Sequence, residues 1–332
     1  MKKFKKRLKS IRYFFEYIAI LSGYFMIIIM PHRALFFMAD IAGYVIYMIP
    51  KFRKLIIANL TVAFPEKKNC EIRRIAKKNA ANIALTAIEF LWFIGKDKKI
   101  DELVHYRREE ADLTKKYMEN GTGAIWATPH LGNWEVAGLK FKRAEGIPFA
   151  VVVRIMQNPY MNKIVNSGRM SEGSRVIPAK GAVKGMMKAL KDGFFVATLI
   201  DQNTKGRDGG IFVNFFGLPV ATSRAPALFA RKMNVPVTVG GCIRKGRRYE
   251  TFTRELPKPT SEYATDKELI QAIMDETERI IRQYPDQYLW LYERWRYIPH
   301  DLNENQKKLY PYYAADVTPR FYDDSAPKGS TF

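Results

Sequence analysis

From Gly121 onward the chain alternates short apolar runs with segments of helical periodicity, and this alternation restricts its fold more than any other feature. The runs are rich in β-branched and aromatic residues and are bounded by Gly or Pro, which is typical of buried strands. They comprise residues 123–128, 149–153, 194–200 and 235–241. Helices are expected at residues 181–191, 222–233 and 266–283. Such an order predicts an α/β fold with a mostly parallel central sheet flanked by helices.

Residues 69–94 form a strong helical pattern upstream of these strands. Apolar residues recur there at helical spacing, Lys and Arg occupy the early polar face, and Gly95 is expected to end the helix. Residues 301–332 are polar and aromatic without periodicity, so we expect a loosely attached polar tail. The chain therefore divides into an N-terminal segment at residues 1–50, a main domain at residues 51–300 and this tail.

The N-terminal segment places a basic run directly before two apolar stretches. Residues 1–12 carry seven Lys and Arg and no acid, the apolar stretches are residues 13–30 and 34–50, and bases resume at Lys51. The first stretch is close to the roughly 20 residues that span a bilayer. Basic flanks at both ends favour a hairpin or an interfacial helix pair over a single span. We expect a helical segment that anchors the protein to a membrane, and the sequence does not determine its topology.

Two other interpretations of this segment are weaker. A secretory signal peptide would need a small-x-small cleavage site, which the apolar stretch lacks. A buried pair of core helices would account for the apolar faces, but not for the seven bases immediately upstream.

The excess of basic over acidic residues limits the kinds of partner that the chain is expected to bind. The chain has 55 Lys and Arg against 33 Asp and Glu, a formal charge of +22, which predicts an anionic partner such as a phospholipid surface, a nucleic acid or an acidic protein or substrate. Nucleic acid is disfavoured because no recognisable binding motif is present and the richest basic cluster adjoins the apolar stretches. Two cysteines exclude a disulfide framework and a Cys-based zinc module, and four histidines disfavour a His-rich metal site. A non-enzymatic basic protein bound to a membrane stays an alternative.

The densest group of reactive side chains is Thr128–Glu135 (TPHLGNWE), which follows the first predicted strand. Ligands usually bind at the strand ends of open α/β sheets, so the loop would present His130 to one. Glu135 lies in the first turn of the next helix, and a turn at Gly132 would bring its carboxylate within hydrogen-bond reach of the imidazole. A carboxylate on one ring nitrogen raises the basicity of the other. We therefore expect a general base, His130, oriented by Glu135.

The same residues also have a purely structural interpretation. The helix macrodipole favours a Glu in the first turn, and Asn133 is a good N-cap by itself.

No Ser or Cys of a G-x-S-x-G elbow lies nearby, so the base would act on a substrate hydroxyl.

Other polar residues end the later strands in the same way. Arg154 follows residues 149–153, where a guanidinium could bind a phosphate or stabilise an oxyanion, although a surface arginine is an alternative. Asp201 and Gln202 end residues 194–200. We expect Asp201 to anchor the site by holding a loop or an arginine such as Arg154.

The segment TPHLGNWE resembles the H-x-x-x-x-D/E motif of glycerolipid and lipid A acyltransferases, and most closely the signature of the late lipid A acyltransferases, the lauroyl/myristoyl transferase family. Further matches follow in order over roughly residues 10–300: Asn59-Leu60, Ala63-Phe64-Pro65-Glu66, Arg154, Asn158-Pro159, Arg169 with Gly173, Asp201-Gln202, Phe215-Phe216-Gly217, and Tyr288-Leu289-Trp290 with Arg294-Trp295. Pro129 and the segment YERWR depart from the family pattern, which leaves the exact substrate open.

This resemblance implies an O-acyltransferase at the bacterial inner membrane, with its catalytic domain on the cytoplasmic side. The enzyme would transfer a fatty acyl chain from a thioester, on acyl carrier protein or coenzyme A, to a hydroxyl of a lipid A precursor, an anionic glycolipid. A lysophospholipid or phosphatidylinositol mannoside acceptor is the alternative. No metal or other cofactor is implied.

The resemblance also assigns residues to roles. His130 and Glu135 would be catalytic, and either Arg154 or backbone amides near Gly132 would stabilise the oxyanion. Substrate contacts are expected from Arg154, Asn158, Arg169, Asp201 and Gln202. Acyl chain length stays open.

Overall fold

The structure is a computed structural model that describes residues 13, 16–17, 21–119, 121, 123–144, 146–153, 156, 158–160, 162, 174–179, 181–323 and 325. The basic run at residues 1–12 lies outside this part of the chain.

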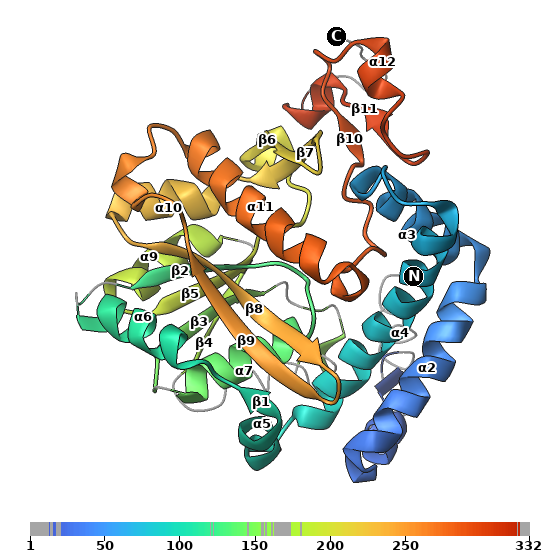
Figure 1. Ribbon diagram of the computed structural model, residues 1–332. Helices are drawn as coiled ribbons and strands as arrows, with labels where there is room; N and C mark the ends of the chain where they lie inside the picture. The colour runs from blue at the N-terminus through green and yellow to red at the C-terminus, as the bar shows by residue number, and fades with distance from the viewer. Residues whose placement is uncertain are drawn as a thin grey trace, which may run out of the picture.

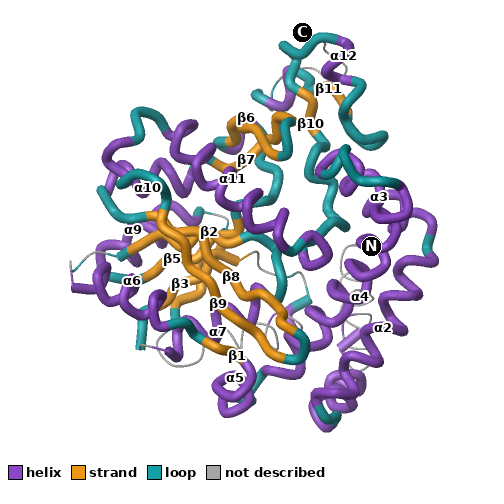
Figure 2. The backbone as a smooth tube through the Cα atoms, in the orientation of Figure 1, coloured by secondary structure: helices purple, strands orange, loops and turns teal. Residues whose placement is uncertain are grey.

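A seven-stranded sheet forms the centre of the molecule (Figures 1 and 2), in the order β1-β9-β8-β2-β5-β3-β4. Its strands are β1 (Val104–His105), β2 (Ala124–Thr128), β3 (Phe149–Val153), β4 (Arg175–Pro178), β5 (Phe195–Leu199), β8 (Val237–Lys245) and β9 (Arg248–Glu255). Every neighbouring pair is parallel except β8 and β9, which form an antiparallel hairpin. The four strands expected from sequence are confirmed, and so is the mostly parallel sheet.

Helices cover both faces of the sheet, and the central strand β2 shows why. Ile125 and Ala127 pack into one core with residues of α9 (Ala182–Lys191), α10 (Ala225–Met233) and α11 (Asp266–Gln283). Ala124 and Trp126 point to the other face, into a second core with α7 (Trp134–Ala144). Because side chains alternate along a strand, a continuous apolar run such as β2 is buried on both faces. The three helices expected at residues 181–191, 222–233 and 266–283 are confirmed.

A group of N-terminal helices packs beside the sheet. It consists of α2 (His32–Met48), α3 (Pro50–Ala63), α4 (Asn69–Phe93) and α5 (Asp97–Leu103). Helix α6 (Arg108–Glu119) lies apart from them and contacts β9, where the Tyr117 hydroxyl donates to Glu255 at 2.7 Å. The long helix α4 confirms the expected helix at residues 69–94, and Gly95 follows it with a positive φ of 72°. Helix α2 runs alongside α4 (Figure 1), and Gly43 allows the close approach, since a Cβ there would lie 2.4 Å from the Ala81 Cα.

Within the described residues no single helix is both long and apolar enough to cross a membrane. Helices α2 and α3 satisfy that test only together, as a pair bent by 90°.

The C-terminal segment is more ordered than the polar tail expected from residues 301–332. It begins beside the hairpin of β6 (Gly210–Phe215) and β7 (Leu218–Ser223), and it contains β10 (Tyr297–Ile298), α12 (Glu304–Lys307) and β11 (Ala315–Asp316). Its buried residues include Ile298, Tyr310, Val317 and Phe321. The expectation of loose attachment is therefore wrong for the described part of this segment, because its scattered aromatic residues pack against the main domain.

Candidate active site

His130 lies on a tight loop between the end of β2 and the start of α7. Gly132 makes this loop possible, since its φ is +61° and a Cβ there would lie 1.9 Å from the Cys242 carbonyl oxygen. Asn133 then caps α7, with its Oδ1 accepting a hydrogen bond from the Val136 amide at 3.1 Å. The ring of His130 is buried and packs edge-on against Trp134, with the ring centroids 5.0 Å apart.

The carboxylate hydrogen-bonded to His130 belongs to Asp201. Its Oδ1 lies 2.7 Å from His130 Nδ1, and its Oδ2 accepts a hydrogen bond from the His130 backbone amide at 2.8 Å. The strand register explains this meeting. Thr128 pairs with Leu199 at the ends of the parallel strands β2 and β5, so His130 and Asp201, each two residues beyond its strand, lie side by side.

Electrostatics make this pair suited to proton transfer. Burial alone would lower the pKa of His130, but the charge of Asp201, its hydrogen bond and the charge of Glu135 outweigh burial and raise that pKa. Burial alone would raise the pKa of Asp201, but the charge of His130 and two hydrogen bonds from that residue lower it. The carboxylate stays ionised and accepts the Nδ1 proton, which leaves Nε2 as the basic atom.

Gln202 is the neighbour of this basic atom, with its Nε2 3.5 Å from His130 Nε2. The chain thus brings together three of the residues expected from sequence: His130, Asp201 and Gln202.

Glu135 does not hold the imidazole as expected. The hydrogen bonds of the His130 ring go to Asp201 and Gln202, whereas Glu135 acts on it through charge. The physical reason is the sheet: the strand end that carries Asp201 is the direct neighbour of the one that carries His130. Glu135 instead starts α7 and lines the adjoining cavity.

The backbone amides near Gly132, expected to stabilise an oxyanion, are already engaged. The amide of Leu131 donates to Pro129, that of Gly132 to Gln287 and that of Asn133 to Cys242, at 2.8, 2.9 and 3.0 Å. An amide that donates to a carbonyl within the fold is not available to a substrate, so this expectation is wrong for these three.

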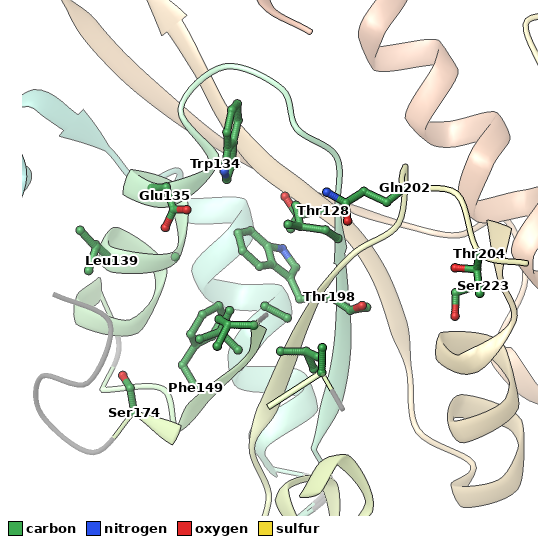
Figure 3. A pocket seen from close by; sticks show the side chains of 18 of the residues that line it. Thr128, Trp134, Glu135, Leu139, Phe149, Ser174, Thr198, Gln202, Thr204 and Ser223 are labelled. Carbon is green, nitrogen blue, oxygen red and sulfur yellow. The ribbon is translucent and has the colours of Figure 1, made fainter. Parts of the chain in front are cut away.

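A cavity of about 630 Å³ opens beside His130, between α7 and the face of the sheet that carries Trp126. Figure 3 shows Glu135 on α7 facing Thr128 and Gln202 across this space, with Phe149 further down. The lower walls are mainly apolar and include Trp126, Leu139, Phe149, Val151 and Ala197. The cavity therefore combines a polar end at Thr128, Glu135 and Gln202, next to the His130–Asp201 pair, with a mainly apolar body, a shape suited to a molecule with a reactive head and a hydrocarbon chain.

The other residues that the sequence indicated as substrate contacts are not found beside His130 in the described part of the chain. Arg154 and Arg169 lie outside the described residues. Asn158 is buried, and its side-chain amide donates to the Tyr13 carbonyl at 3.3 Å and to Glu16 Oε2 at 3.2 Å. Asn158 therefore holds the N-terminal segment in this structure.

Two residues of the late motif stand close to the site without having been assigned a role. Burial and the neighbouring Asp201 carboxylate raise the pKa of Tyr288 well above its usual range. Arg294 is buried, and it donates to Asn203 Oδ1 and to the Ala221 carbonyl, both at 2.8 Å. It thereby fixes the loop that follows Asp201. Their order in the motif was the only sequence signal for them.

The amino-acid sequence of the chain can be compared with those of known proteins. A sequence model of the family described as bacterial lipid A biosynthesis acyltransferase matches residues 1–297. The chain is similar to the lipid A biosynthesis lauroyltransferase of Escherichia coli (strain K12), with 25% identity over 309 residues, 90% of this chain and 96% of the relative. The palmitoleoyltransferase of lipid A biosynthesis from the same strain is 25% identical over 247 residues, 73% of this chain and 78% of that protein.

A similar match comes from outside lipid A biosynthesis. A phosphatidylinositol mannoside acyltransferase of Mycobacterium tuberculosis (strain ATCC 25618 / H37Rv) is 25% identical over 190 residues, 56% of this chain and 58% of the relative.

Proposed function

Because the chain belongs to the bacterial lipid A biosynthesis acyltransferase family and is an acyltransferase, we propose that it transfers a fatty acyl chain from a thioester donor to a hydroxyl of a lipid A precursor. The observation that carries this proposal is the His130–Asp201 pair next to the polar end of a mainly apolar cavity, where Gln202 lines the cavity and lies beside the ring of His130. The donor would be acyl carrier protein or coenzyme A carrying the acyl chain.

In the proposed mechanism, His130 Nε2 removes the proton of the acceptor hydroxyl, and the resulting alkoxide attacks the thioester carbonyl carbon. Asp201 stabilises the imidazolium formed in this step, because its ionised carboxylate accepts the Nδ1 proton. The tetrahedral intermediate then collapses, the carbon–sulfur bond breaks, and the leaving thiolate takes the proton back from Nε2. The products are the new ester and the free thiol of the carrier.

Glu135 has a charge role in this scheme. Its carboxylate lines the cavity and raises the pKa of His130, so it would favour the imidazolium that forms when the acceptor is deprotonated. The proposal thus keeps His130 and Glu135 as catalytic residues and adds Asp201 as the residue that orients the ring.

The oxyanion needs a donor other than the engaged amides. The Gln202 side-chain amide faces the cavity beside His130, and Arg154 follows β3, which also lines the cavity. We propose these two as oxyanion or phosphate contacts, with Asn158 and Arg169 as further substrate contacts.

The apolar body of the cavity is the proposed site of the acyl chain. Its apolar walls come from β2, β3, β5 and α7, and the polar residues Thr198 and Ser174 also line the space below the level of Thr128 and Gln202. An acceptor bound at the same end would present its hydroxyl to His130. A phosphatidylinositol mannoside is the second candidate acceptor, favoured by the mycobacterial relative.

An exposed apolar stripe on α2 supports attachment to a membrane. Its residues are Phe37, Ile41, Tyr44, Val45 and Met48, all exposed at successive turns of the helix. Basic Lys51 and Lys54 follow on α3 and are also exposed. An apolar helix face with adjoining bases is typical of an interfacial helix, so we propose that this stripe lies on the cytoplasmic face of the bacterial inner membrane.

The test is acyl transfer by the full-length protein. Purified protein with a lipid A precursor and an acylated carrier protein should yield a precursor heavier by one acyl chain in mass spectrometry. His130→Ala should lose this activity by about 10²–10⁴-fold while keeping the fold. Transfer by His130→Ala at the wild-type rate would refute the mechanism, and transfer only to a mannosylated phosphatidylinositol would replace the acceptor.

A further inference from the structure

A buried carboxylate contacts residues 130–133, the catalytic loop, and is not among the residues that line the cavity. Glu89 of α4 is fully buried, and its Oε2 accepts hydrogen bonds from Asn133 Nδ2 at 3.0 Å and from Arg244 at 3.1 Å. Its Oε1 accepts a hydrogen bond from the Tyr249 hydroxyl and lies 3.1 Å from His32 Nε2. Five different parts of the fold therefore meet at one charge: α2, α4, β8, β9 and the catalytic loop.

Helix capping does not require this charge. Asn133 caps α7 through Oδ1, and an Asn or a Ser performs that function without a carboxylate behind it. Burying Glu89 with Arg244 costs desolvation that the mutual attraction of the two charges often fails to recover. The bond from Asn133 Nδ2 to Glu89 thus needs an explanation beyond the stability of α7.

Geometry supplies one explanation, because the catalytic loop is held at both of its ends. Asp201 holds His130 through the ring and the backbone amide, and Glu89 holds Asn133. Three residues of chain span at most about 10 Å, so a shift of Asn133 is passed on to His130. The Thr86 hydroxyl, 2.9 Å from the Gly132 carbonyl oxygen, adds a contact from the same helix α4.

We propose that Asn133, held by the buried Glu89, is a positioning residue that keeps His130 aligned with Asp201 during acyl transfer. This inference rests on the function proposed above. A misplacement of about 1 Å at a reacting group can cost on the order of 10²-fold in rate, so the contact acts on the chemical step rather than on substrate binding.

Asn133→Ser separates the two functions of this side chain. A serine hydroxyl can still cap α7, but it is too short to reach Glu89 and leaves the carboxylate with its other partners. We expect kcat to fall about 10- to 100-fold with little change in the KM of donor or acceptor. The control is Thr277→Val on α11, which removes a buried hydroxyl that donates to the Ile273 carbonyl far from the loop, and should leave kcat unchanged.

Combination with His130→Ala tests whether the effect passes through the catalytic base. The residual rate of His130→Ala should not fall further when Asn133→Ser is added, because no ring remains to be aligned. A wild-type kcat in folded Asn133→Ser, or the same fold-loss in both backgrounds, would overturn the inference.

Two outcomes separate this inference from its premise. No transfer by the wild-type protein would refute the proposed function itself, whereas an active wild type with an equally active Asn133→Ser refutes only the positioning role. Should Asn133→Ser not fold, Asn133→Thr replaces it, since threonine also caps a helix and is too short to reach Glu89. If neither variant folds, Asn133 is a folding determinant and the inference is wrong.

Discussion

The two oxygens of the Asp201 carboxylate hold two different atoms of His130: Oδ1 lies 2.7 Å from the ring Nδ1 and Oδ2 lies 2.8 Å from the backbone nitrogen. One contact fixes the tautomer and the other fixes the loop that carries the ring. A single buried side chain therefore sets both the chemistry and the position of the base.

Asp201→Asn should change the rate and its pH dependence together. The general base must be neutral, so activity rises with pH through the pKa of His130, which Asp201 raises. Removing that charge leaves burial, which lowers the pKa, so the acidic limb of the kcat/KM profile should move to lower pH. The maximum rate should fall by up to about 10⁴-fold, the loss seen for the same change in a Ser-His-Asp triad.

The control for this prediction is Asp208→Asn, in the exposed turn beyond the same strand. It should leave both the limb and the maximum rate unchanged. An acidic limb that stays in place in Asp201→Asn would show that another group sets the protonation state of the base.

Gly138→Leu should shorten the acyl chain that the enzyme accepts. A Cβ at Gly138 would lie 3.4 Å from Phe149 Cε1, an ordinary contact, so the new side chain would extend into the cavity without moving the backbone. Stability should not fall, since Leu is favoured over Gly in a helix by up to about 1 kcal/mol. Competition between donors of increasing chain length measures the shift, and Gly138→Ala should give a smaller one. An unchanged preference in Gly138→Leu would place the chain elsewhere.

The extent to which sequence predicts this site depends on the range of the interactions. The strands and their helices were predictable because apolar periodicity is a local property of the sequence. The position of His130 just beyond a strand end was predictable for the same reason. Asp201 was recognised as a polar residue at another strand end, but its partner was not. The contact follows from the pairing of β2 with β5, which are separated by three crossovers, so no local pattern in Thr128–Glu135 reports it.

Some elements and contacts were not predicted from sequence because they, too, depend on interactions between distant parts of the chain. Strand β9 alternates buried residues with charged ones at the edge side of the sheet, and its run of polar residues hides the strand signal. In the C-terminal segment, Tyr310 and Phe321 are buried by contacts with distant parts of the chain, without a period of their own. Glu89 looked like one acidic residue on a long helix, and only the tertiary fold surrounds it with donors.

Glu110→Gln should stabilise the protein above neutral pH. Burial raises the pKa of Glu110 from 4.5 to about 7, so between these values the folded protein binds a proton that the unfolded chain has released. Stability therefore falls as pH rises through this window, by up to about 3 kcal/mol. Glutamine removes this penalty, and urea unfolding at pH 5 and pH 8 should show the larger gain at pH 8. The exposed neighbour Glu109→Gln is the control; an equal gain at both pH values would contradict the prediction.

Phe37→Lys should weaken membrane binding without unfolding the protein. Phe37 is 69% exposed on the apolar stripe of α2, so it contributes little to the core, while a lysine there would have to enter the apolar part of the interface. Leu309→Lys provides a matched control, because Leu309 is 62% exposed but lies in the C-terminal segment, away from α2. Sedimentation of the full-length protein with vesicles containing anionic lipid should show reduced binding for Phe37→Lys and wild-type binding for Leu309→Lys. Equal binding of all three proteins would show that the α2 stripe does not contact the bilayer, whereas equal losses in both variants would show that exposed apolar area, rather than this helix face, determines attachment.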